Sequence, residues 1–185
     1  HLLARLARCL LHLAQSQKRL SRRAEAIANL AAARRILCSP RLGRRIDAME
    51  TRALVCANAA ELHERRKDHD RAMGDWLESA ALVQACLEAG SYRLPDLFAG
   101  VIDSAGRCLP RIGTRGTRLR RARQLAWLLD RPALAGRSAL PLLAAEAVES
   151  VAAALQQAGR LAEARQLPEL AMLRNGGTGE HPARA

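Results

Sequence analysis

Residues 148–164 read VESVAAALQQAGRLAEA. Apolar side chains recur in this stretch at spacings of three and four residues, which predicts an amphipathic helix with one buried stripe. Gly159 interrupts that pattern, and a second apolar pattern begins at Leu161. A glycine between two helical patterns is typical of a tight turn. The stretch therefore predicts two helices that fold back on one another.

The turn and the start of the second helix, AGRLAEA at residues 158–164, resemble a tetratricopeptide repeat. Two antiparallel helices approach closely only where one of them presents a small residue to the other. The positions at which this repeat alternates large and small residues are held by Val148, Val151, Ala152, Leu155 and Ala171. The resemblance implies a right-handed superhelix, or solenoid, of antiparallel helix pairs.

Two further segments fit the same template. The equivalent positions of the second pair hold Cys56, Ala59, Ala60, Ala72, Trp76 and Ser79, and those of the first hold Leu10, Leu13, Ala14, Ala26, Leu30 and Ala33. The third pair fits only from Leu119 onward, because residues 110–116 form an expected inserted loop. The chain departs from the family pattern in its longer spacing between pairs, and Pro168 stands where an aromatic residue is expected.

Breaks in the apolar pattern divide the chain into about four helix pairs. The expected first helices span residues 2–17, 49–66, 94–109 and 139–158, and the second helices span 22–37, 69–89, 117–129 and 160–173. We expect one helical-repeat domain over residues 1–174 and a disordered tail over 175–185, which lacks an apolar pattern. A plain helical bundle or a HEAT-like array is the alternative architecture.

The composition also favours an all-α fold. Leucine and alanine dominate, β-branched residues are sparse, and the aromatic residues are Tyr92, Phe98, Trp76 and Trp127. Leucine and alanine lose little side-chain entropy in helices, whereas sheets favour β-branched and aromatic residues.

The chain is strongly basic, with a formal net charge of +12 carried mostly by arginine. This charge indicates either an anionic partner or the codon bias of a GC-rich genome, and the sequence leaves both interpretations open. The densest basic run supplies candidate anion-binding residues: Arg107, Arg111, Arg118, Arg120, Arg121 and Arg123. Arginine forks suit phosphates and carboxylates.

Five dispersed cysteines without a C-x-x-C pair argue against a disulfide framework and favour a reducing compartment. No apolar run approaches the length of about 20 residues that spans a bilayer. We therefore expect a cytoplasmic protein without a membrane span.

Catalytic signatures are missing from the sequence, so we expect no enzyme and no cofactor. His63 and His69, six residues apart, do not share a helical face, and the three cations between them would repel a divalent ion. No metal site is therefore expected there, and Asp68 is instead expected to cap the helix that follows. Glu146 and Glu149 are expected on a solvated or groove-lining face rather than in a catalytic pair.

The leading functional hypothesis is a non-catalytic scaffold that binds a protein or peptide partner, as a regulatory segment of a larger protein. The resemblance implies a concave groove lined by first helices, with Gln15, Asn58, Glu61, Glu146 and Glu149 as candidate lining residues. A nucleic-acid-binding basic helical domain is the alternative, disfavoured because few aromatic residues are available for base stacking.

The N-terminal segment HLLARLARCLLHLAQ is strongly apolar for a terminal helix. Leu3, Leu6, Leu10, Leu13 and Ala14 are expected on one buried face. A helical array exposes apolar surface at an uncapped end. The segment therefore predicts either further repeats upstream or self-association through this helix.

Overall fold

The computed structural model describes residues 2–91, 95–129 and 140–167. Within these ranges the chain is helical and contains no β-strand, which confirms the all-α fold class. The helices are α1 (Leu2–Arg19), α2 (Arg23–Leu37), α3 (Ile46–Arg65), α4 (His69–Glu88), α5 (Pro95–Cys108), the 3-10 helix η1 (Leu109–Arg111), α6 (Arg115–Leu129) and α7 (Leu140–Gln157), followed by a helical segment at residues 161–167.

The helix ends lie close to the predicted ones, because the turns carry local conformational signals. Each of three turns contains a residue with a positive φ angle. Ser21 lies between α1 and α2 with a φ of 61°, and Lys67 lies between α3 and α4 with a φ of 61°. Gly159 lies between α7 and the segment 161–167 with a φ of 76°. Asp68 caps α4, as predicted, and its carboxylate accepts a hydrogen bond of 3.3 Å from the Arg71 backbone N–H. The predicted loop from Pro110 to Gly116 is shorter than expected, since α6 already begins at Arg115.

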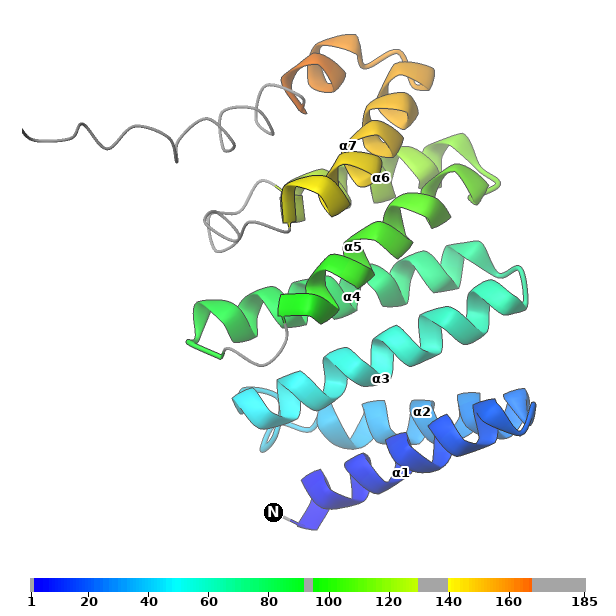
Figure 1. Cartoon of the computed structure of the whole chain (residues 1–185), viewed down its shortest axis with the longest axis vertical. Coiled ribbons are helices and arrows are strands. Elements are labelled where there is room, and N and C mark those ends of the chain that lie inside the picture. Colours follow the sequence, from blue (N-terminus) through cyan, green and yellow to red (C-terminus); the bar gives the residue numbers. More distant parts are fainter. Residues whose placement is uncertain (1, 92–94, 130–139, 168–185) are drawn as a thin grey trace, which may run out of the picture.

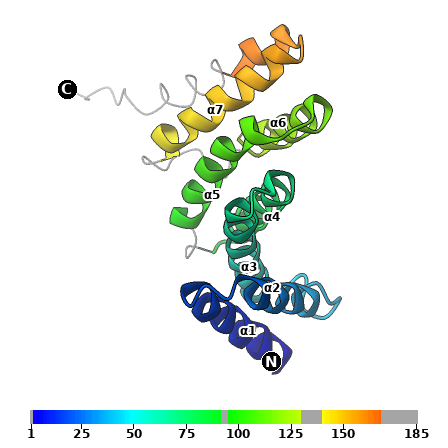
Figure 2. The ribbon, with the colours of Figure 1, turned by 90° about the vertical axis from the view of Figure 1, so that its right-hand side faces the viewer.

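The helices are stacked in sequence order along the long axis of the molecule (Figure 1). The pairs α1–α2 and α3–α4 pack closely, and α2 packs on α3 and α4 on α5 (Figure 2). The predicted third pair differs, because α5 and α6 do not pack extensively on each other. Instead, α7 contacts both of them. The intervening η1 turn separates the two helices that the sequence pattern paired.

Two buried clusters form the core, and α3 contributes to both. One cluster joins α1, α2 and α3 through residues such as Leu11, Leu30 and Leu62. The other extends from α3 to the segment 161–167 and includes Phe98 and Leu125. Small residues at the second-helix contacts are buried, both Ala26 and Ala72 of the predicted template and Ala122 and Ala164 further along the chain.

The buried stripe of α1 differs from the predicted one. Ala4, Ala7, Leu11 and Ala14 face the core, whereas Leu3, Leu6 and Leu13 are exposed and Leu10 is partly exposed. Small residues on the inner face allow α2 to approach closely, which turns the leucines outward. Self-association through this helix therefore stays a prediction.

Several predictions fall outside the described residues, namely the second-helix residues beyond 167, Ala171, Pro168 and the tail 175–185. In the part of the chain that the structure describes, no helix is both long and apolar enough to cross a membrane.

Helices α5 and α7 approach each other closely at Gly106. A Cβ atom added there would lie 2.8 Å from Ala147 Cα, below any ordinary contact distance. On the same helix, Gly100 has open space around it, with nothing within 4 Å of an added Cβ.

We expect Gly106→Ala to destabilise the protein by about 1–3 kcal/mol, because the helices must separate to admit the methyl group. Gly100→Ala is the matched control and should be neutral or stabilising by up to about 1 kcal/mol, since alanine favours helix. Urea unfolding followed by circular dichroism measures both. Equal effects of the two substitutions would contradict the close contact.

Candidate functional site

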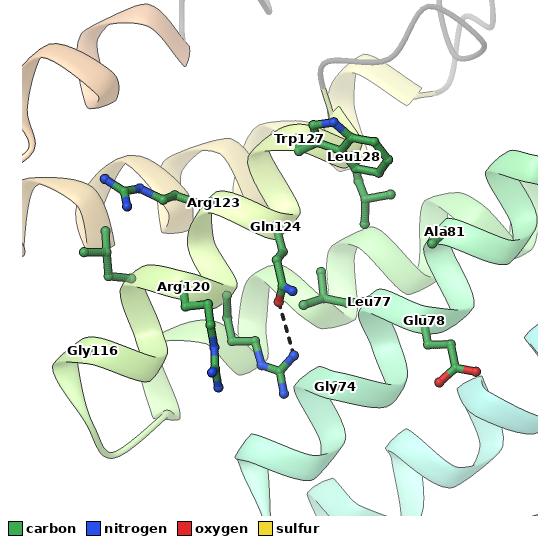
Figure 3. A pocket seen from close by; sticks show the side chains of 12 residues that line it. Gly74, Leu77, Glu78, Ala81, Gly116, Arg120, Arg123, Gln124, Trp127 and Leu128 are labelled. Atoms are coloured by element: carbon green, nitrogen blue, oxygen red, sulfur yellow. Dashed lines mark hydrogen bonds between the residues drawn. The ribbon is translucent and has the colours of Figure 1, made fainter.

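An open hollow of about 710 Å³ lies between α4 and α6 (Figure 3). Its α4 wall consists of small and apolar side chains with one carboxylate, and its α6 wall is basic and ends in a tryptophan. The lining residues are Gly74, Leu77, Glu78, Ala81, Gly116, Leu119, Arg120, Arg121, Arg123, Gln124, Trp127 and Leu128.

The basic wall comes from consecutive turns of α6. Arg121 donates a hydrogen bond of 3.2 Å to Gln124, and its Nε lies 3.8 Å from Asp70. Gly74 leaves the space that this guanidinium occupies, because an added Cβ would lie 3.2 Å from Arg121 Nη2. The side chain of Arg121 therefore lies close to α4 at Gly74, where a larger residue would crowd it.

Arg123 is paired with a carboxylate, whereas Arg120 has no ion-pair partner among the described residues. Arg123 makes two hydrogen bonds, of 3.0 and 2.9 Å, to the carboxylate of Glu163. These bonds, with those from Arg160, lower the pKa of Glu163. Arg120 is exposed and makes no ion pair with any other described residue. Its guanidinium is thus available to an anionic ligand.

Trp127 and Leu128 lie at one end of the hollow (Figure 3). The Trp127 side chain is 56% exposed, whereas Leu128 and Leu77 are buried beneath the surface. A large exposed indole beside buried leucines is an apolar contact surface with a polar rim, a common feature of protein-binding sites.

A polar network joins the α4 wall of the hollow to helices α2 and α3. Arg34 of α2 donates a hydrogen bond of 2.7 Å to Asp75 and also pairs with Glu78. Arg52 of α3 donates to Glu78 at 2.8 Å, and His63 lies 3.7 Å from Asp75. Burial raises the pKa of the Asp75 carboxyl, and the Arg34 guanidinium only partly offsets this effect.

Three of the six predicted anion-binding arginines, Arg120, Arg121 and Arg123, meet at the hollow. The other three lie elsewhere. Arg107 pairs with Asp103 on α5, and Arg111 is exposed on η1. Arg118 donates to the Ile112 carbonyl at 2.6 Å and to Gln157 at 2.9 Å, and so connects the η1 turn with the end of α7.

None of the five predicted groove-lining residues borders the hollow. Glu61 and Asn58 accept hydrogen bonds from Lys18, at 2.6 and 3.2 Å, which hold α1 against α3. Gln15 is half-buried beside His12, and Glu146 and Glu149 are exposed on α7. Three of the lining residues were not predicted as site residues, namely Gly74, Leu77 and Trp127, since only the packing of α6 over α4 brings them together.

A separate group of side chains has metal-ligand chemistry. Glu64, His69 and Cys108 place one ligand atom each within 4.8 Å of one another, and none of them lines the hollow.

No family model matches the sequence. No curated protein matches it either. Among solved structures, the chain is similar to the crystal structure of BtubC (BKLC) from P. vanneervenii, with a TM-score of 0.52 and 18% sequence identity. The similarity covers 97% of this chain and 68% of that chain. At this identity it shows a shared helical fold.

We expect Arg34→Ala to cost roughly 2–4 kcal/mol at neutral pH, because it leaves the buried Asp75 carboxylate without its main partner. A raised pKa means that the folded protein binds this proton at a higher pH than the unfolded chain does. Losing Arg34 raises the pKa of Asp75 further. The cost of the substitution should therefore shrink as the pH falls and Asp75 becomes protonated.

Arg35→Ala, on the exposed face of α2, is the control and should change stability by less than about 0.5 kcal/mol. Denaturant unfolding at several pH values tests both variants. A cost of Arg34→Ala that is independent of pH would show that Asp75 is not the group left unpaired.

Proposed function

We propose that the chain is a non-catalytic helical-repeat scaffold that binds an acidic segment of a protein partner in the hollow between α4 and α6. The observation that carries the proposal is the combination of Arg120, Arg121 and Trp127 on one wall of that hollow. The charged side chains of the lining are three arginines and one glutamate, a sum of +2.

Charge complementarity favours a carboxylate-bearing partner. The guanidinium of arginine can bind a carboxylate through two parallel hydrogen bonds, and Arg120 has none of its donors in an ion pair among the described residues. Glu78 is the one acid of the lining, and Arg34 and Arg52 already neutralise it. An acidic ligand therefore meets little repulsion from the α4 wall.

The second anchor is apolar. Tryptophan and arginine are the residues most enriched among those that dominate binding energy at interfaces. Trp127 is 56% exposed and lines the hollow together with the buried Leu77 and Leu128, and it offers an apolar contact to a leucine or aromatic side chain of the partner. The segment that best fits the hollow is thus acidic with at least one large apolar residue.

The right-handed, tetratricopeptide-like superhelix is part of the same proposal. It is supported by the close pairs α1–α2 and α3–α4 and by the buried small residues at the second-helix positions. The hollow lies between α4 and α6. The groove that the resemblance implies is lined by first helices, so the hollow lies on a different surface. A cytoplasmic location is supported by five cysteines that are all free thiols.

Nucleic acid is the second candidate partner, favoured by the net charge of +12. Single strands usually stack successive bases on several aromatic side chains. Of the aromatic side chains that the structure describes, Trp76 and Phe98 are buried and Trp127 is exposed. One exposed aromatic side chain beside partly neutralised arginines favours a carboxylate-bearing peptide over a nucleic-acid strand.

To test the proposal, a random dodecapeptide library is panned against the protein, and selected peptides are measured by fluorescence anisotropy. We expect peptides that combine acidic and large apolar residues. Arg120→Glu and Trp127→Ala should each weaken binding at least about tenfold, or 1.4 kcal/mol. Arg8→Glu, an exposed change of equal charge on α1, is the control and should leave the affinity nearly unchanged.

Two results would contradict the proposal. One is selection of peptides without acidic residues, and the other is equal weakening by Arg8→Glu and Arg120→Glu. Generic single-stranded DNA is measured in parallel at low and physiological salt. Strong DNA binding that Arg120→Glu removes, without peptide selection, would establish the nucleic-acid alternative instead.

A further inference from the structure

Three helix ends meet at one side of the stack. Glu64 is in the last turn of α3, His69 is the first residue of α4, and Cys108 is the last residue of α5. The α3–α4 turn and the end of α5 lie on the same side of the stacked helices, on the right in Figure 1. A carboxylate oxygen, a ring nitrogen and a sulfur atom thereby come within 4.8 Å of one another.

The ring of His69 contains a buried nitrogen atom, Nδ1, that lacks a hydrogen-bond partner among the described residues. Buried ring nitrogens are nearly always hydrogen-bonded or bound to a metal, because an unpaired one loses its hydration without compensation. The imidazole that lies beside Glu64 and Cys108 thus has a buried ring nitrogen without a partner among the described residues.

The thiol of Cys108 is buried, and its Sγ lies 3.2 Å from the His69 carbonyl oxygen. Burial raises the pKa of this thiol to about 12, the neighbouring Glu64 carboxylate raises it as well, and Arg111 lowers it. A divalent cation is the species that stabilises its thiolate in such a place.

Charges of both signs lie near the cluster, and the Arg111 guanidinium is the cation that acts on Cys108. Three cations separate His63 from His69 in the sequence. All three are exposed to solvent, namely Arg65, Arg66 and Lys67. The repulsion expected from the sequence is therefore screened by water. His63 lies near Asp75 instead, and Asp70 adds a negative charge close to Cys108.

We propose that Glu64, His69 and Cys108 form a binding site for a borderline divalent cation of the zinc type. Sulfur, imidazole nitrogen and carboxylate oxygen are the ligands that zinc takes in proteins, at about 2.0–2.3 Å. Tetrahedral ligands at such distances lie about 3.3–3.8 Å apart, so side-chain rotations of the three residues complete the geometry. Water takes the fourth position.

The charges and protons balance when the cation binds. The Cys108 thiol releases its proton to solvent as the sulfur–metal bond forms, Glu64 contributes a carboxylate and His69 a neutral lone pair. One thiolate and one carboxylate together neutralise the two positive charges of the ion. The bound ion fastens the α3–α4 turn to the end of α5, and so stabilises the junction between the second helix pair and the helices that follow.

The test uses the full chain with Cys9→Ser and Cys38→Ser, which remove the two exposed thiols. Reduced protein is titrated with Co²⁺ alone, a spectroscopic substitute for Zn²⁺. We expect a sulfur-to-cobalt charge-transfer absorption that saturates at one equivalent and disappears when Zn²⁺ is added. Cys108→Ser should abolish it, whereas Cys86→Ser, at another buried cysteine outside the cluster, should retain it.

Glu64→Gln and His69→Gln provide further variants, which keep side-chain size at partly exposed positions. Each should weaken Co²⁺ binding at least tenfold while the helical circular dichroism stays unchanged. No charge-transfer band in the parent protein would overturn the proposal, as would a band that survives Cys108→Ser. Unchanged affinity in folded Glu64→Gln and His69→Gln would also overturn it, even if Cys108→Ser does not fold.

Discussion

Close approach of helices at small residues is the constraint on which the rest of this structure depends. Gly106 lies against Ala147, and Ala26, Ala72 and Ala122 are fully buried at the contacts of their helices. Such contacts bring helices near enough for the surrounding leucines to fill the space between them. A larger side chain at these contacts therefore forces the helices apart, at a cost in stability.

The hollow follows from one interruption of this packing. After α5, the η1 turn and the loop behind it carry the chain away, and α6 returns over α4 without packing extensively on α5. Helix α7 contacts both α5 and α6. Helix α4 contacts α6 much less extensively than it contacts α3 or α5, so the face of α6 toward α4 is only partly covered. Arg120, Arg121 and Trp127 line this incompletely filled space, and there they can contact a partner.

The sequence predicts local structure well and long-range neighbours poorly. Helix α3 was expected at 49–66 and spans Ile46–Arg65, because apolar periodicity and turn residues act over a few positions. The pairing of α5 with α6 was wrong, since a short connection alone does not make two helices pack. The proximity of Cys108 to His69, and of Gly74 to Arg121, depends on helices distant in sequence. No periodicity encodes such contacts, and only the charge run on α6 indicated part of the candidate site.

Hydrogen–deuterium exchange with and without a selected acidic peptide tests the central claim most directly. If the segment binds in the hollow, slowed exchange of backbone amides should concentrate in α4 and α6, around Gly74 to Ala81 and Arg120 to Leu128. Protection confined to α1, α3 and α7, near Asn58, Glu61 and Glu149, would place the partner on the first helices and contradict the account.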